Sequence, residues 1–244
     1  MIINLYCHTC ATTATADQPL KLPSKVFIND HGVYDAKCPI GHKSRIYLRN
    51  PKFELLFESG ANALLDGYLL QGVASFAAAL EQFQVFYIRA VCEKRSSPNE
   101  MVLKALKQHV NRAERQLGAY VTLFLIENGS VPKLLPEDPA VKLRNKIIRR
   151  GYFPSEDEAT NYGQAVLELL EAGYRQLLEK YQSELATLDR DSLLSQIGPL
   201  NAGGHDGEPV TYTMLTILRT CLEYPNIPVD LKKGLVALRA RRCD

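Results

Sequence analysis

Four residues near the N-terminus have the types and the spacing of a metal site. Cys7 and Cys10 are separated by two residues, and His42 follows Cys38 at the fourth position. A two-residue gap lets one tight turn present both thiolates, and zinc takes thiolates and imidazoles as its four tetrahedral ligands. The second turn contains a proline and a glycine, which supply a fixed φ and a permitted positive φ. The pattern therefore predicts a zinc ribbon whose metal is structural rather than catalytic.

Other interpretations of these cysteines are weaker. A redox pair would need a βαβ pattern after Cys10, and none follows. Unrelated thiols are also disfavoured, because the segment before Pro51 contains too little apolar surface to fold without a metal. His8 or His31 could replace His42 as the fourth ligand. Three cysteines lie in expected helices or in the tail and are expected to be bystanders: Cys92, Cys221 and Cys243.

A second group of candidate residues lies between residues 141 and 154. At about 100° per residue, a helix places four cations on one face: Lys142, Lys146, Arg149 and Arg150. Apolar residues cover the other side: Val141, Leu143, Ile147 and Ile148. Arg144 is expected in the middle of that apolar side, where a guanidinium must be paired or line a cleft. Glu81 is the partner expected for a structural Arg144, and the cationic face could equally be a solvated helix surface.

The composition of the chain changes at Asn50, between the segment with the predicted metal ligands and the segment with the cationic helix. The segment before it is rich in turn residues and contains short β-like runs. We expect a hairpin formed by residues 26–28 and 33–34, and another strand at 44–48. We therefore expect a zinc-ribbon module over residues 1–50.

After Asn50 the chain is expected to be helical. A stripe of apolar residues at steps of three and four runs from Leu65 to Val91. Further helices are predicted from Pro98 to about Glu127, over 141–150, and from a capping box at Ser155 to about 188. Residues 198–209 carry four glycines and are expected to form a loop before two more helices.

Composition sets limits on the class of protein. Hydrophobic residues make up 46% and charged residues 23%, an ordinary globular balance, and the formal net charge is only +2. That charge does not by itself argue for nucleic acid or a membrane surface. No run approaches the roughly 18 apolar residues of a membrane span, and the N-terminus does not resemble a secretory signal. We expect a cytoplasmic protein whose cysteines bind metal or are buried thiols.

The helical part resembles the HEPN superfamily, helical bundles found in many prokaryotic toxins, antitoxins and defence proteins. The resemblance rests on residues 79–88 and 143–148 and covers roughly residues 51–188. The family motif is an arginine, usually a polar residue, a few further positions and then a histidine. Arg144 and Asn145 match its first two positions, but Arg149 stands where the histidine is expected. In active members the histidine helps an RNA 2′-hydroxyl attack the adjacent phosphate without metal, and the arginine holds that phosphate.

The resemblance implies a mainly α protein: an HEPN-like bundle over residues 51–188, preceded by the β zinc ribbon and followed by a helical extension at 189–244. It also implies a homodimer in which two motif helices face each other. A prokaryotic or phage defence or toxin–antitoxin setting is expected, with a partner protein of such a system possible. Three residues would form the motif site: Arg144, Asn145 and Arg149. Three more would bind nucleic acid: Lys142, Lys146 and Arg150.

Arginine keeps its proton at physiological pH and cannot serve as a general base. We therefore expect a nucleic-acid-associated protein, with RNA as the expected ligand, that is catalytically weak or silent. One alternative is an active metal-independent ribonuclease that uses Tyr152 or His205 as its base. Another is a protein-interaction scaffold.

Overall fold

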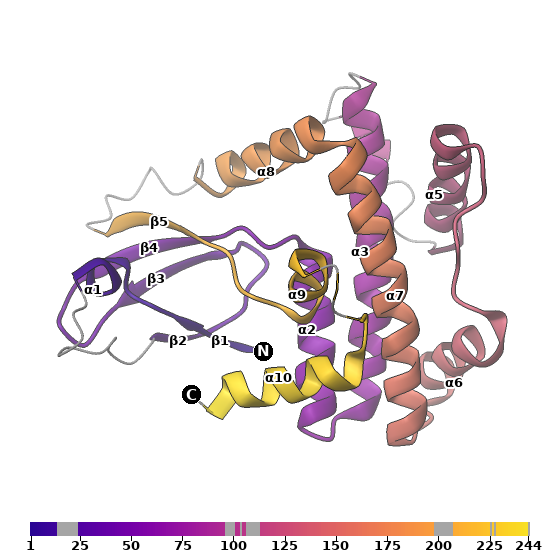
Figure 1. Cartoon of the computed structure of the whole chain (residues 1–244), viewed down its shortest axis with the longest axis horizontal. Helices are drawn as coiled ribbons and strands as arrows, with labels where there is room; N and C mark the ends of the chain where they lie inside the picture. The colour runs from indigo at the N-terminus through magenta and orange to yellow at the C-terminus, as the bar shows by residue number, and fades with distance from the viewer. Residues whose placement is uncertain are drawn as a thin grey trace. The chain divides into compact units, whose positions relative to one another are not determined.

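The computed structural model describes residues 1–13, 24–95, 101–102, 104–105, 113–197, 207–224, 226 and 228–243. The chain is mainly α-helical and has short strands in its N-terminal part, as predicted (Figure 1). It divides into two compact units, Met1–Asn50 with Asp189–Met214, and Pro51–Leu188 with Leu215–Asp244. The predicted C-terminal helical extension, residues 189–244, is divided between the two units. Its first part contributes a strand to the N-terminal unit, and its second part buries Leu218 and Leu231 in the helical unit.

In its described residues the N-terminal unit contains two small sheets, a short helix after the first strand and, from Asp189, the end of a longer helix. A two-stranded antiparallel sheet pairs β1 (Ile2–Leu5) with β2 (Ser24–Phe27). The second sheet has the order β3-β4-β5, with β3 (Val33–Lys37), β4 (Lys43–Leu48) and β5 (Glu208–Tyr212). The short helix α1 (His8–Thr13) follows β1. The sequence did not reveal β5, which includes the last two residues of the predicted loop at 198–209 and pairs in parallel with β4. The rest of that predicted loop, apart from Gly207, lies outside the described residues.

The predicted hairpin of residues 26–28 with 33–34 is wrong. β2 pairs with β1, and β3 instead pairs with β4 in a register that places Tyr34 opposite Ile46. Both of these side chains are buried, so the observed pairing puts apolar residues on one inner face. The turn that joins β3 to β4 is the segment from Cys38 to His42, which carries two predicted metal ligands.

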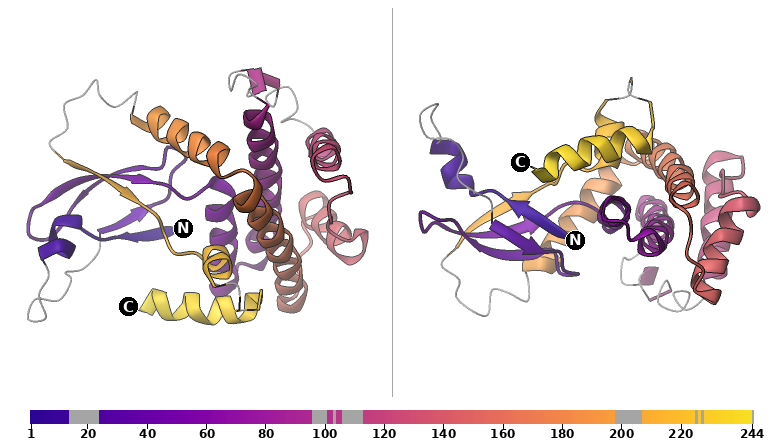
Figure 2. Two further views of the ribbon diagram at one scale, coloured as in Figure 1. Left: turned by 45° about the horizontal axis from the view of Figure 1, so that its top comes forward. Right: turned by 90° about the horizontal axis from the view of Figure 1, so that it is seen from below.

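The helical unit is built around α2 and α3, with further helices on both sides. Its elements are α2 (Lys52–Leu65), α3 (Leu69–Lys94), α5 (Ala113–Asn128), a π-helical turn η1 (Glu137–Val141), α6 (Lys142–Arg150), α7 (Glu156–Lys180), α9 (Ile217–Glu223) and α10 (Leu231–Cys243). The boundary between the units falls within α8 (Gln182–Ile197). The views in Figure 2 agree that α5 and α6 lie on the side of α3 opposite α2. Among the described residues, no helix has the length and hydrophobicity to cross a bilayer.

The predicted apolar stripe of α3 forms the centre of the core. The following members are almost completely buried: Val73, Phe76, Phe83, Tyr87 and Val91. Gly60 of α2 lets the two helices approach closely, because a Cβ there would lie 2.7 Å from the Phe76 ring. Phe53 of α2 completes an aromatic cluster, with its ring centroid 5.3 Å from that of Phe83.

The predicted long helix after Ser155 begins as expected but is divided in two. Ser155 and Glu158 form the capping box, with bonds of 2.8 and 3.2 Å. The helix ends at Lys180, and α8 starts after Tyr181, whose buried hydroxyl donates to Glu127 at 2.7 Å. No glycine or proline marks this break. Of the helix predicted from Pro98 to Glu127, the structure describes α5, whereas residues 106–112 lie outside the described part.

Candidate metal centre and motif helix

The four predicted metal ligands come together in the N-terminal unit. Cys7 follows β1, Cys10 lies in α1, and Cys38 and His42 flank the turn between β3 and β4. Their ligand atoms all lie within 4.8 Å of one another. The turn is closed by two backbone bonds, from Cys38 N–H to His42 O at 3.0 Å and from Gly41 N–H to Cys38 O at 2.9 Å. Gly41 has a φ of +102°, which accounts for a glycine at this position.

The distances within this cluster fit a four-coordinate metal. His42 Nδ1 lies 3.4, 3.6 and 3.8 Å from the sulfurs of Cys10, Cys38 and Cys7, and the Cys10 and Cys38 sulfurs are 3.7 Å apart. A tetrahedral centre with metal–sulfur bonds of about 2.3 Å needs ligand separations of about 3.5–3.8 Å. The Cys10 N–H also points to the Cys7 sulfur, at 3.5 Å. The cluster could therefore hold a metal ion.

The surroundings of the cluster favour ionised sulfur at one position and oppose it at another. Burial opposes ionisation of Cys38, but hydrogen bonds from the backbone N–H groups of Ile40 and His42, together with those from the Cys10 and Cys7 thiols, lower the pKa of this thiol to about 6. Burial and the neighbouring thiols raise the pKa of Cys10 to about 11. A bound metal would remove the protons from all three thiols.

Two lysines flank the turn that carries Cys38 and His42. Lys37 and Lys43 are direct cross-strand neighbours at the ends of β3 and β4. Like charges in such a pair destabilise a sheet. A divalent metal with three thiolates carries a net negative charge, and two adjacent cations would offset it.

The remaining histidine and cysteine candidates lie outside the cluster. His8 and His31 are exposed and do not belong to the group of four. Cys92 lies in α3 and Cys221 is buried in α9, and neither belongs to the cluster. The side chain of Cys243 lies outside the described part of the chain.

The predicted helix at 141–150 is α6, but its faces differ from the prediction. Leu143 and Ile147 are buried, whereas Ile148 is 58% exposed. Arg144 therefore does not lie in the middle of a buried face, and its side chain is 29% exposed. It donates to the Glu81 carboxylate of α3, which is the partner expected from the sequence. The apolar face is narrow because α6 contacts the bundle mainly along α3.

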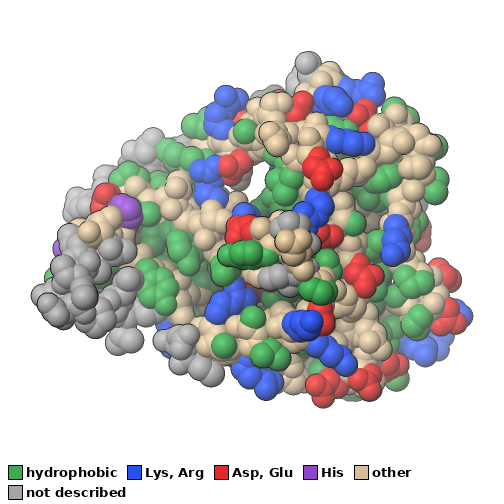
Figure 3. Space-filling model, viewed as in Figure 1, with side chains coloured by type: hydrophobic (Ala, Val, Ile, Leu, Met, Phe, Trp, Pro, Cys, Tyr) green, Lys and Arg blue, Asp and Glu red, His purple; other side chains and the backbone are tan. Residues whose placement is uncertain are grey.

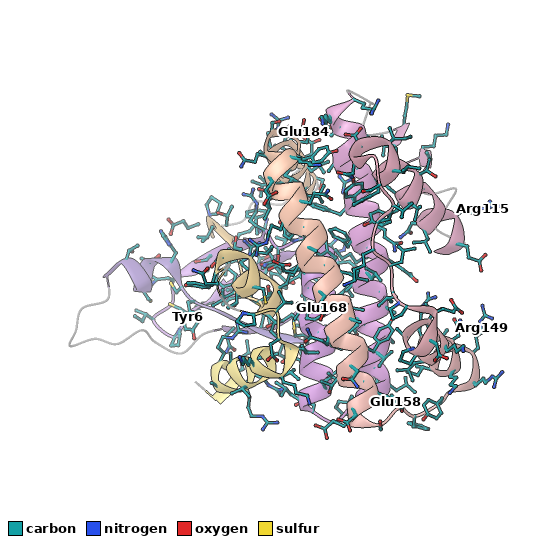
Figure 4. All side chains as sticks on the ribbon, turned by 45° about the vertical axis from the view of Figure 1, so that its right-hand side comes forward. Tyr6, Arg115, Arg149, Glu158, Glu168 and Glu184 are labelled. Atoms are coloured by element: carbon teal, nitrogen blue, oxygen red, sulfur yellow. The ribbon has the colours of Figure 1, made fainter. Side chains whose placement is uncertain are left out.

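The basic residues of α6 have different surroundings. Lys142 pairs with Asp138 at 2.7 Å, and the Lys146 ammonium lies 5.5 Å from the centre of the Tyr152 ring. Arg149 and Arg150 are exposed, and no described carboxylate lies within ion-pair distance of either one. Figure 4 shows Arg149 pointing away from the helices.

The motif residues do not converge within one chain. Arg144 and Arg149 are five positions apart, which places them about 140° apart around an α-helix. Asn145 is half-buried beside Arg144.

Of the two alternative bases, the structure describes only Tyr152. The Tyr152 hydroxyl donates to Glu158 at 3.1 Å, which raises the pKa of Tyr152 and makes it a poorer base at neutral pH. His205 and His109 lie outside the described residues, and the rest of the helical unit contains no histidine.

Sequence analysis missed two fully buried carboxylates on α2. Glu54 accepts two bonds from Arg219, at 3.1 and 3.0 Å, and one from the Thr216 hydroxyl. Glu58 accepts the Ile217 N–H at 2.9 Å and a longer contact from Arg241. Burial raises the pKa of Glu58 to about 7, although Ile217 and Arg241 lower it. Both glutamates directly follow core phenylalanines, a pattern that could have revealed them.

The analysis also missed Tyr162 of α7. Its side chain is 2% exposed, and its hydroxyl has no hydrogen-bond partner among the described residues. Burial raises the pKa of Tyr162 to about 12; Arg144 acts to lower it and Glu81 to raise it. The hydroxyl is therefore within electrostatic reach of the Arg144–Glu81 pair.

These two groups of residues, the metal cluster and the surroundings of Arg144, are the candidate sites of the protein. Comparisons of the chain with models of protein families, with characterised proteins and with solved structures gave no match.

Proposed function

We propose that the protein is a non-catalytic RNA-binding protein with a structural zinc centre. The observation that carries the RNA-binding proposal is the exposed, unpaired charge of Arg149 and Arg150 at the end of α6, next to an exposed aromatic residue. The resemblance to HEPN proteins favours RNA over other polyanions. It also favours a role in a prokaryotic or phage defence or toxin–antitoxin system.

The metal is proposed to be zinc because of the ligand set. Three thiolates and one imidazole in a tetrahedral cluster are typical of structural zinc, and hard cations such as Mg²⁺ prefer oxygen ligands. With four protein ligands the centre has no open position for a substrate. Zinc would join α1 to the β3–β4 turn and so stabilise a unit whose own core is small.

The proposed RNA surface combines charge with an aromatic side chain. Phe153 is 82% exposed, and the loop that carries it is held at both ends. Gly151, at a φ of +62°, caps α6, and Ser155 starts the capping box of α7. Guanidinium groups contact phosphates, and an exposed ring can stack on an unpaired base. The acidic first turn of α7, with Glu156 and Asp157, limits this surface on one side, and Figure 3 shows acidic side chains at that end of α7.

We infer that the protein is not catalytic because Arg149 occupies the position of the motif histidine. A guanidinium donates hydrogen bonds and holds a phosphate, but it does not exchange a proton at neutral pH. The angular separation of Arg144 and Arg149 also keeps them from acting on one phosphate in a single chain.

A homodimer is a further part of this proposal and follows from the resemblance. Ile148 of α6 and Ile126 of α5 are exposed apolar residues that a second copy would cover. Light scattering at micromolar concentration should give the mass of two chains, and the mass of one chain would contradict this part.

The RNA-binding proposal is tested with a labelled single-stranded RNA of about 20 nucleotides at several salt concentrations. The wild type should bind, and its affinity should fall steeply with salt, because each phosphate contact releases counterions. The triple variant Lys146→Gln/Arg149→Gln/Arg150→Gln should bind at least about tenfold more weakly and show a shallower salt dependence.

The matched control removes the same charge from another helix. Lys232, Lys233 and Arg239 are exposed on α10 of the same unit, where Figure 3 also shows basic side chains. Changing all three to Gln should leave the affinity close to that of the wild type. Equal losses in both triple variants would show only a general effect of net charge and would contradict the proposed surface.

A further inference from the structure

The loop between α6 and α7 carries a phenylalanine ring that lies almost entirely in solvent. The Phe153 side chain is 82% exposed, the largest exposed fraction of any large apolar side chain in the described part of the chain. A single exposed apolar residue is common on protein surfaces, so this exposure alone does not indicate a function. The support of the loop and the charges beside it are the further observations.

The loop is anchored on both sides of the ring. The Gly151 N–H donates to a carbonyl of α6 at 3.0 Å, and the Ser155 N–H donates to the Glu158 carboxylate at 2.8 Å. Pro154 is buried, and a proline restricts the residue before it to an extended backbone. The Phe153 ring can therefore meet a ligand without prior ordering of the loop, which reduces the entropy cost of binding.

The neighbouring tyrosine is already engaged in contacts within the chain. The Tyr152 hydroxyl donates to Glu158 at 3.1 Å, and the Lys146 ammonium lies 5.5 Å from the centre of the Tyr152 ring. Its side chain is also less than half as exposed as that of Phe153. Phe153 is thus the aromatic group of this loop that can receive a base.

The charges on the two sides of the ring have opposite signs. Arg149 and Arg150 form the last turn of α6, whereas Glu156 and Asp157 begin α7. Phosphates are attracted to the guanidinium groups and repelled by the carboxylates, so an RNA backbone should lie over the end of α6. A base of that strand can then reach Phe153 only if it is unpaired, because the bases of a duplex are stacked on one another.

We propose that this surface selects single-stranded over double-stranded RNA, because one unpaired base stacks on Phe153 while Arg149 and Arg150 hold the adjacent phosphates. The inference rests on the proposed RNA binding and adds the class of RNA to it. Charge alone would not give a selectivity in this direction, since a duplex carries its phosphates at higher density. The arginines supply affinity for any strand, and the ring supplies the preference for unpaired bases.

Three probes separate stacking from charge in the full chain: the labelled RNA strand, its duplex with the complementary strand, and a strand of equal length without bases. The wild type should bind the RNA strand more tightly than the duplex, and about tenfold more tightly than the base-free strand. Phe153→Leu keeps an apolar side chain but has no aromatic face. It should weaken binding of the RNA strand about tenfold and leave binding of the other two probes unchanged.

Two further variants control for effects on packing. Phe27→Leu makes the same change at a ring that is 76% exposed on β2, and it should bind every probe within about twofold of the wild type. Phe153→Trp enlarges the aromatic face and should retain or strengthen binding of the RNA strand. Because the Phe153 ring is exposed, both variants of this residue should unfold at the same urea concentration as the wild type.

The outcomes separate this inference from the proposed function. If Lys146→Gln/Arg149→Gln/Arg150→Gln loses binding while Phe153→Leu matches the wild type on all three probes, stacking is refuted and RNA binding stands. Equal losses of Phe153→Leu on all three probes, or tighter binding of the duplex than of the single strand by the wild type, also overturn the inference. If the wild type binds none of the probes, the proposed function fails together with it.

Discussion

Arg144 of α6 donates to the Glu81 carboxylate of α3, and both side chains are partly exposed. This pair links the motif helix to the main helix of the bundle. Its exposure distinguishes it from the pair of Arg219 with Glu54, whose carboxylate is fully buried. The two pairs should therefore differ in what they contribute to stability.

We expect a small coupling energy between Arg144 and Glu81. A double-mutant cycle with Arg144→Gln and Glu81→Gln should give no more than about 1 kcal/mol, because solvent screens a partly exposed pair. The equivalent cycle with Glu54→Gln and Arg219→Gln should give a clearly larger value, since removing one partner leaves a buried charge. Urea unfolding of the wild type, the four single variants and the two double variants measures both coupling energies. A larger value for Arg144 and Glu81 would show that solvent does not screen this pair.

We expect about one zinc ion per chain in the purified protein. Elemental analysis measures it, and Cys38→Ser should abolish it because one of four ligands is lost. That variant should also unfold the N-terminal unit, with increased proteolysis between residues 1 and 50. Cys92→Ser, in α3 outside the cluster, should keep both the metal and the protease resistance. A chain without metal whose N-terminal unit stays folded after chelation would contradict the proposed centre.

The buried Glu58 should make stability depend on pH. Its pKa is raised to about 7 in the folded chain, so the folded state holds this proton more tightly than the unfolded state does. The stabilisation is then complete below about pH 4.5 and is lost as the pH rises through about 7. Relative to Glu58→Gln, the wild type should lose about 3 kcal/mol of unfolding free energy between pH 4 and pH 8.

Urea unfolding of the wild type and Glu58→Gln across this range measures that difference. Glu223→Gln, which changes an exposed carboxylate of α9, serves as the control and should run parallel to the wild type. A wild-type curve parallel to that of Glu58→Gln would mean that Glu58 titrates normally, for example because water reaches it.

The elements with strong local signals could be predicted from the sequence. The α3 stripe follows from its apolar period, α6 from its amphipathic pattern, and the start of α7 from Ser155 and Glu158. The metal cluster follows from ligand spacing, because two short turns need little tertiary information. These features depend on residues that are close together in the chain.

The incorrect predictions concern elements whose partners are distant in the sequence. β5 joins β4 across more than 150 residues, and the sequence around Glu208 carries no signal of that partner. The hairpin prediction paired residues 26–28 with 33–34, whereas the turn that carries Cys38 and His42 connects the pair that forms, β3 and β4. The exposure of Ile148 and Arg144 is also not local, because it depends on which neighbouring helix covers α6.

We expect the wild type to leave RNA intact in the presence of EDTA. No histidine lies beside Arg144 in the described residues, the Glu81 carboxylate there already accepts a hydrogen bond from the Arg144 guanidinium, and the Tyr152 hydroxyl is held by Glu158. Arg149→His restores a side chain with a pKa near neutrality, but about 140° of helix rotation still separates it from Arg144. This variant should therefore also be inactive as a monomer. Cleavage by Arg149→His that leaves cyclic phosphate ends, and that requires Arg144, would mean that a second copy completes the site. Wild-type cleavage with the same ends, lost in Arg144→Gln, would instead show an active ribonuclease whose base lies outside the described residues.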